Sequence, residues 1–379
     1  MGNMRLAEAV ATAVLMFAPF AASAQNTAES VAAENVAVAE SAAPAENIAL
    51  ADSVAVLDGR VSKLEKIISK LPTVSGFVQV QYSWSEEESV FQVYRARITF
   101  SGKIYKDFAD YCITPEFAGS VRLLDAFVRI TPFRQLNLQA GAFRPAFTIE
   151  NVFYGATSME AIDFPQVVRR MTTIDDVTGI KGGGRDVGVQ LYGGFFNQRG
   201  FSTLEYKIGV FNGAGLSAKD TDSSKDVAAM LIVNPIKHLA LVGSMYYGGC
   251  RAADKRYYAR NRWDAGFRYD DGKFFARGEY IWGMTGGVKD YADNLRSEGA
   301  YVMAGVWFLE HRLAPLARVE YYAENLRDRR NTAEQYYTVG VLYSPFKYLR
   351  FQANYTYRAS ADRAVEPLNQ IRVMLTGMF

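Results

Sequence analysis

The feature that most constrains this chain is an alternation of apolar and polar residues that runs from about Val74 to Phe379. Positions 78, 80, 82 and 84 are apolar, with polar residues between them, and the same period of two returns at 349–358 and 370–379. Successive side chains of a β-strand point to opposite faces, so this period predicts strands. The pattern predicts about 16 strands of roughly 10 residues, the length a tilted strand needs to cross a bilayer.

The connections between these strands alternate between short and long. Three short ones share a proline, which we expect at the second position of a type I turn: Thr131–Leu136, Asn234–Leu239 and Ser344–Leu349. The others are longer and polar, for example 212–225, 283–298 and 359–368. Tight turns at one end and long loops at the other are typical of outer-membrane barrels with both termini on the periplasmic side.

The two faces of the predicted strands indicate a membrane barrel with a watery interior. The apolar face often ends in aromatic residues, which suit the lipid headgroup level: Trp84, Phe100, Tyr280, Trp282, Tyr343 and Tyr357. A soluble β-sandwich also alternates, but its strands are near 5 or 6 residues long. A sheet in lipid must close, and about 16 strands leave room for water inside. We therefore expect an all-β fold, a transmembrane antiparallel β-barrel.

The chain before the barrel divides into three predicted segments. Residues 1–24 are predicted to be a signal peptide, with a basic start, an apolar stretch and small residues at its end. Residues 25–53 are rich in Ala and Glu and predict a disordered linker. Residues 54–72 carry a heptad stripe that ends at Pro72, which predicts a short helix or coiled-coil segment, packed on the barrel or on copies of itself. The barrel itself is predicted over 73–379.

The polar face carries many charged residues. By parity its basic members are Arg95, Arg97, Arg129, Lys207, Arg268, Arg277, Arg318, Arg350, Arg358 and Arg372. We expect more than half of these charges to pair across neighbouring strands.

The longest connection, from Pro145 to Gly184, is apolar for a loop in solvent, so we expect it to fold into the barrel and narrow it. The candidate residues for a pore constriction that binds anions are Arg95, Arg97, Arg144, Arg169, Arg170, Lys181 and Arg185.

Other functions have little support in the composition. A net charge of +2 argues against a nucleic-acid partner. Cys112 and Cys250 do not make a disulfide framework, and two thiols are favoured over a pair. His238 and His311, both in presumed periplasmic turns, are the only histidines, so a zinc site or a histidine-based enzyme is disfavoured. We expect no catalytic residues, no cofactor and no metal.

Five short segments together resemble the phosphate-selective porin O and P family, in the form found in Bacteroidetes-type bacteria. They are residues 93–97 (VYRAR), 123–128 (LLDAFV), 141–147 (GAFRPAF), 184–190 (GRDVGVQ) and 209–213 (GVFNG). The resemblance implies a trimeric porin in the outer membrane of a Gram-negative bacterium. It implies passive diffusion of small hydrophilic solutes, a preference for small anions and a candidate selectivity for phosphate. The terminal Phe379 resembles the signal read by the outer-membrane assembly machinery. The alternative is a structural or adhesion barrel with an N-terminal periplasmic stem.

Overall fold

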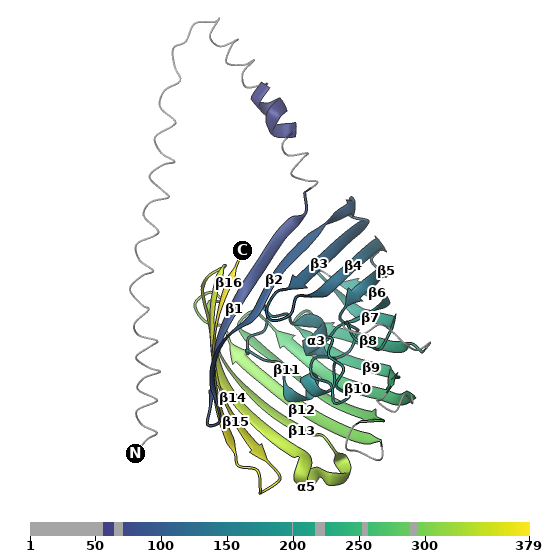
Figure 1. Ribbon diagram of the computed structural model, residues 1–379. Coiled ribbons are helices and arrows are strands. Elements are labelled where there is room, and N and C mark those ends of the chain that lie inside the picture. Colours follow the sequence, from purple (N-terminus) through teal and green to yellow (C-terminus); the bar gives the residue numbers. More distant parts are fainter. Residues whose placement is uncertain (1–55, 64–70, 199, 217–223, 252–256, 289–293) are drawn as a thin grey trace, which may run out of the picture. The chain divides into compact units, whose positions relative to one another are not determined.

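The computed structural model describes residues 56–63, 71–198, 200–216, 224–251, 257–288 and 294–379, without the side chains of residues 250, 251 and 257. Sixteen antiparallel strands form one closed barrel, in which each strand pairs with its neighbours in sequence and β1 pairs with β16 (Figure 1). The all-β closed barrel expected from the alternation is confirmed.

The strands of the first half are β1 (Thr73–Ser85), β2 (Ser89–Tyr105), β3 (Ala109–Glu116), β4 (Arg122–Phe133), β5 (Leu136–Phe143), β6 (Asp186–Gln198), β7 (Phe201–Phe211) and β8 (Asp226–Ile236). Those of the second half are β9 (Leu239–Arg251), β10 (Tyr257–Asp270), β11 (Phe274–Thr285), β12 (Leu295–Val306), β13 (Leu313–Ala323), β14 (Ala333–Phe346), β15 (Leu349–Ser360) and β16 (Leu368–Met378).

Strand β1 shows how the alternation places side chains. Gln79 and Gln81 are buried inside the barrel. Val78 and Val80, which alternate with them along the strand, are exposed on the outward face. Hydrogen bonding between strands satisfies the backbone, so the outward face can be apolar and meet lipid. The inward face then has to accommodate the polar side chains.

The three proline-containing connections differ in detail from the expected type I turns. Pro132, Pro235 and Pro345 lie within β4, β8 and β14, each beside a shift in register with the next strand. The turn residues follow two positions later, at 134–135, 237–238 and 347–348. Proline has no N–H to donate, and a bulge is a place in a sheet where a missing donor is tolerated. The prolines therefore mark bulges rather than the corner of each turn.

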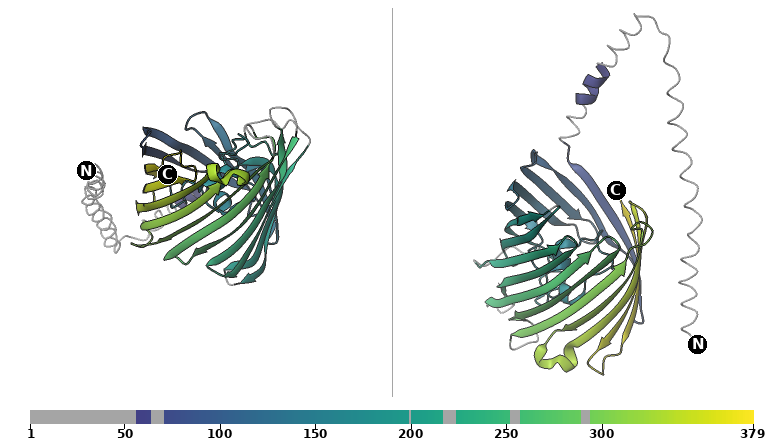
Figure 2. Two further views of the ribbon diagram at one scale, coloured as in Figure 1. Left: turned by 90° about the horizontal axis from the view of Figure 1, so that it is seen from below. Right: turned by 180° about the vertical axis from the view of Figure 1, so that it is seen from behind.

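The connection between β5 and β6, residues 144–185, folds into the barrel as expected. It contains two short helices, α3 (Ile149–Phe153) and α4 (Gln166–Arg170), and lies inside the ring of strands (Figure 1 and Figure 2). Ile149 packs with inward side chains of β8 and β9, and Val167 and Met171 pack with those of β11 to β14. We call this connection the inner loop.

Two glutamates of the barrel wall hold the helices of the inner loop. The carboxylate of Glu279 on β11 accepts hydrogen bonds from the backbone N–H groups of Ile149 and Glu150 at the start of α3. Glu320 on β13 accepts one from the backbone N–H of Gln166 at the start of α4, at 2.6 Å. The first N–H groups of a helix lack partners within the helix, so a side-chain oxygen that accepts from them is favourable. The wall thus fixes the inner loop on one side of the lumen.

The N-terminal region is described only in part. Residues 56–63 are helical, and they lie within the predicted helix of 54–72. The predicted signal peptide (1–24) and linker (25–53) lie outside the described residues. None of the described helices has the length and apolar character needed to cross a bilayer. Cys112 on β3 is a free thiol.

Candidate pore constriction

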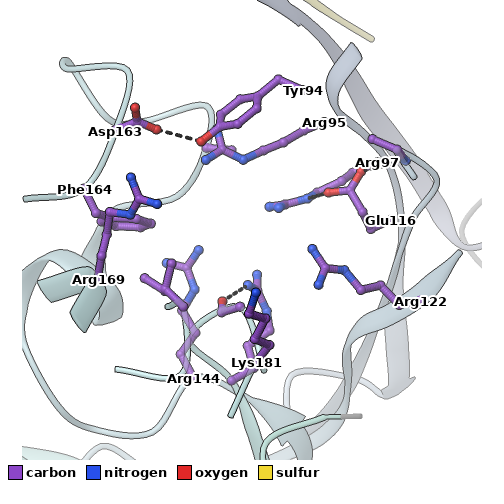
Figure 3. A pocket seen from close by; sticks show the side chains of 15 residues that line it. Tyr94, Arg95, Arg97, Glu116, Arg122, Arg144, Asp163, Phe164, Arg169 and Lys181 are labelled. Carbon is purple, nitrogen blue, oxygen red and sulfur yellow. Dashed lines mark hydrogen bonds and ion pairs between the residues drawn. The ribbon is translucent and has the colours of Figure 1, made fainter. Parts of the chain in front are cut away.

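A cavity of about 310 Å³ lies between the inner loop and strands β2, β3 and β4. Seven basic side chains and two acidic ones line it, and the labelled basic groups surround an open centre (Figure 3). The basic residues are Arg95, Arg97, Arg122, Arg144, Arg169, Lys181 and Arg185, and the acidic ones are Glu116 and Asp163. We call this space the first basic cavity. Six of the seven predicted site residues meet in it.

A bulge in β2 shapes one wall of the first basic cavity. Gln79 of β1 pairs with Arg95, but Val80 pairs with Val93, so Tyr94 is an extra residue. The Tyr94 hydroxyl donates to Asp163 of the inner loop at 2.6 Å, which places this ring inside the barrel. Alternation counted back from Arg95 predicts an outward Tyr94, and this is wrong because the bulge places two successive residues, Tyr94 and Arg95, on the inward side.

Arg95 lies beside this bulge. Its Nη1 donates to the side-chain oxygen of Gln79 at 2.9 Å, and its guanidinium carbon lies 4.2 Å from the centre of the Tyr94 ring. An aromatic ring face attracts a cation without neutralising its charge. Arg95 is therefore held in place while it remains available to an anion.

Two other arginines of the first basic cavity are paired with carboxylates. Arg97 bonds Glu116 of β3 at 2.7 Å. Arg185 bonds Asp125 of β4 through two nitrogens, at 2.8 and 3.0 Å. A forked arginine–carboxylate pair fixes orientation strongly. These pairs make part of the cavity wall rigid, and they offset two of its positive charges.

Arg144 lies near three other arginines of the first basic cavity. Its Nη1 donates to the backbone carbonyls of Asn151 and Tyr154, each at 2.7 Å. Burial, together with the nearby charges of Arg185, Arg97 and Arg95, lowers the pKa of Arg144 to about 9, against the opposing effect of Asp125. The group stays charged at neutral pH. Like charges held this close together in a partly dry site favour an anion between them.

Arg169 and Arg170 are neighbours on α4 but differ in surroundings. Arg169 lines the first basic cavity. Both lie 3.8 Å from Asp175 of the inner loop, but Arg170 also makes an ion pair with Glu324, beyond the end of β13. Arg170 is therefore the one predicted site residue that does not line the cavity, and its contacts attach α4 to the barrel.

Arg122 lines the first basic cavity but was missing from the sequence-based set. It opens β4, and the register of β3 and β4 shifts between Thr114 and Pro115. Parity counted back from Asp125 points Arg122 outward, and the bulge turns it inward. Periodicity alone carries no sign of such a shift.

A second cavity of about 220 Å³ lies beyond Asp163, Phe164 and Arg169, which line both spaces. It is bounded by inward residues of β13 to β16 and includes Arg318, Arg358 and Arg372. Arg372 of β16 makes an ion pair with Asp163. We call this space the second basic cavity. Asp163, Phe164 and Arg169 of the inner loop form the ridge between the two cavities, and arginines line both sides of it.

Most basic residues of the inward face contact the inner loop rather than an opposite strand. Arg277 bonds Glu150 at 2.6 Å and Glu160 at 2.7 Å, both in the loop. Arg350 donates to the loop carbonyls of Thr157 and Met159, and Arg268 lies over the ring of Phe153. Pairs across strands are fewer, such as that of Arg129 with Asp110. The expectation that pairs across strands would dominate is wrong, because the inner loop supplies closer partners.

Solved porin structures share this architecture. The anion-selective porin from Comamonas acidovorans is similar with a TM-score of 0.64 at 12% identity, over 81% of this chain and 99% of that chain. OmpT of Vibrio cholerae, in its trimer form, gives 0.59 at 13% identity, over 82% and 100%. Salmonella typhi OmpF in complex with daunomycin gives 0.60 at 13% identity, over 82% and 98%. At these identities the similarity is one of fold. No curated protein matches this chain in sequence.

The closed barrel and its inward-folded loop define a porin of the Gram-negative outer membrane, a channel. The family model described as phosphate-selective porin O and P matches residues 77–235, from β1 into β8. This match bears out the resemblance, and all five short segments that carry it lie within the matched residues.

Proposed function

We propose that this porin prefers anions, and that the first basic cavity sets the preference. The observation that carries the proposal is the lining of this cavity, where seven basic side chains face two acidic ones. A narrow passage with one sign of charge and walls of low dielectric concentrates ions of the opposite sign. Since Arg144 is bound by carbonyls rather than by a carboxylate, its charge is available to a passing anion.

Phosphate is the solute we propose as the best fit. Its oxygens match the paired N–H groups of arginine, and a tetrahedral oxyanion can accept from several donors at once. Arg95, Arg144 and Arg169 reach the same space from a strand, a loop and a helix. The matching family model is described as phosphate-selective, and one similar solved structure is an anion-selective porin, so both support this proposal.

We further propose a homotrimer, since one of the similar porins is described in a trimer form. We also propose that the outer-membrane assembly machinery recognises the last strand, β16, together with the Phe379 that follows it.

Single-channel recording in planar bilayers tests the pore proposal. With a KCl gradient across the bilayer, the reversal potential should favour chloride over potassium. Addition of phosphate should lower the chloride current if phosphate binds in the same passage. The triple variant R95Q/R144Q/R169Q should move the reversal potential towards potassium, while R363Q, in the exposed loop between β15 and β16, should leave it unchanged. A wild-type pore that prefers potassium would refute anion preference, and a chloride current insensitive to phosphate would refute phosphate binding alone.

A further inference from the structure

Charged side chains on the outward face of the barrel are gathered in one place. Among the strand side chains that the structure describes, those pointing outward are uncharged except for Arg296 and Glu298 on β12. Their neighbours Leu295 and Ser297 are buried inside the barrel, which fixes the outward direction of both. Both lie at the end of β12 next to a long connection, and long connections lie on the outer side of such barrels. A charge that faces lipid is costly and therefore calls for an explanation.

The connection between β13 and β14 contacts Glu298. It contains a 3-10 helix, η2 (Leu326–Asp328), and the short helix α5 (Arg329–Thr332), which lies at the barrel end opposite to the C-terminus (Figure 1). Arg329 bonds Glu298 at 2.6 Å with its side chain still 54% exposed, and the Tyr280 hydroxyl donates to the same carboxylate at 2.9 Å.

Arginines outnumber carboxylates in this region. Arg296 and the three arginines of the connection, Arg327, Arg329 and Arg330, stand against Glu298, Asp328 and Glu324, and Glu324 is paired with Arg170 of the inner loop. Arg296 and Arg330 are exposed. We call Arg296, Arg329 and Arg330 the outer arginine cluster. A surplus of guanidinium groups at this level suits a phosphate ester, which arginine binds through paired hydrogen bonds.

An apolar groove of about 340 Å³ begins where the charges end. The outward side chains that line it are Ala300, Val302, Val319, Tyr321, Gln335 and Tyr337. Ala300 follows Glu298 by two positions on the same face of β12 and pairs with Tyr321 of β13. The small alanine between larger neighbours produces the depression. The groove has the apolar lining that a hydrocarbon chain requires, and tyrosines flank it as they do at lipid interfaces.

We propose that this face of the porin binds a phosphorylated glycolipid of the outer leaflet, lipopolysaccharide, with a lipid A phosphate on the outer arginine cluster and an acyl chain in the groove. Charge complementarity selects this occupant over a zwitterionic phospholipid. It also selects it over a second copy of the chain, because an apolar contact between subunits would bury these charges at a cost. The outward faces of β4 to β6, with Val128, Ala140 and Val189, are uncharged and suit contact between copies better.

Native mass spectrometry of the detergent-extracted porin, titrated with lipid A or with phosphatidylethanolamine, tests this site. Lipid A should bind the wild type more tightly than phosphatidylethanolamine. The R296Q/R329Q variant should bind lipid A at least about tenfold more weakly, since each arginine near an anionic lipid contributes on the order of 1 kcal/mol. R363Q removes an exposed arginine in another loop of the same barrel end and should bind as the wild type does.

Two further variants guard against a folding defect. R296Q leaves the Arg329–Glu298 ion pair in place and should still weaken lipid A binding. Ala300→Phe keeps every charge, fills the groove and should weaken it as well. Equal affinity for both lipids, or lipid A binding unchanged in R296Q/R329Q, would overturn the proposal. Loss of trimers in that variant with unchanged lipid A binding would do so too, and would make this face a contact between subunits.

Discussion

The hydroxyl of Tyr94 donates a hydrogen bond of 2.6 Å to Asp163, and this contact joins the bulge of β2 to the inner loop. Asp163 also makes an ion pair with Arg372 on β16, and its backbone carbonyl accepts from Arg318 at 2.7 Å. One carboxylate of the protein thus lies on the ridge between two basic cavities. It occupies donors that an anion in transit would otherwise meet, and so acts as an anion built into the pore.

The substitution D163N should make the pore more selective for anions. It removes a negative charge from the ridge, and a unit charge about 4 Å from an ion contributes roughly 1–4 kcal/mol in a watery to partly buried setting. The reversal potential in a KCl gradient should shift further towards chloride. The control E205Q removes a carboxylate on β7 that bonds Asn234 and lines neither cavity, so it should change the potential much less. A shift of D163N towards potassium would contradict this role.

The adjacent arginines of α4 should separate selectivity from stability. R169Q should lower anion selectivity, because Arg169 lines both cavities. R170Q should leave the reversal potential near the wild-type value but lower the stability of the barrel by about 1.5–3 kcal/mol, the range for a hydrogen bond to a charged group. Reversal potentials and the temperature at which the barrel unfolds on a semi-native gel measure the two effects. If R170Q moved the reversal potential as far as R169Q, Arg170 would have to be counted among the pore residues.

Arg122 should behave as a pore residue although its sequence position gives no hint of it. R122Q should shift the reversal potential towards potassium by an amount comparable to R95Q, since both side chains line the first basic cavity. Arg134 lies on the same β4–β5 hairpin, exposed in the short turn at its other end, and supplies the matched control. Equal shifts in R122Q and R134Q would mean that general surface charge, rather than the cavity, sets the potential.

The seam between β1 and β16 gives a prediction about stability. The backbones of Gly76 and Phe379 exchange two hydrogen bonds of 3.0 Å, and the Phe379 ring covers the Gly76 Cα. A Cβ at Gly76 would meet that ring and would lie 2.6 Å from the Arg97 carbonyl oxygen, whereas one at Gly377 would meet nothing within 4 Å. G76V should therefore destabilise the barrel by about 1–3 kcal/mol through overpacking.

The control for this seam is G377V, which adds the same side chain on the neighbouring strand and should unfold at nearly the wild-type temperature. Heat-dependent migration of the folded barrel on gels compares the two variants. If the two variants unfold at the same temperature, the ring of Phe379 moves aside freely and the close fit at Gly76 does not contribute to the stability of the barrel.

The sequence was sufficient to predict the strands, the closed barrel and the inner loop. A period of two is visible without any knowledge of partners, and apolar residues such as Phe147 and Ile162 in a long loop can be satisfied only by packing inside. Six of the seven basic residues proposed for the site meet in one cavity for the same reason, since parity and the ends of the loop point them inward.

What could not be predicted depends on single-residue irregularities and on distant partners. The bulge at Tyr94 and the register shift before Arg122 each reverse the inward–outward assignment, and neither interrupts the hydrophobic pattern. Arg170 was indistinguishable from Arg169 because its partner, Glu324, is 154 positions away in the chain. For the same reason the sequence could not predict that Arg277 pairs with the inner loop, although parity correctly predicted that it points inward.

The pairing of β1 with β16 also limits how the protein can be made. The second neighbour of β1 is β16, the last strand, so the barrel cannot close before the whole chain has been synthesised. Until β16 arrives, β1 has an open edge that another polypeptide can occupy. A stop codon before β16 would therefore yield an unsealed sheet and not a narrower pore.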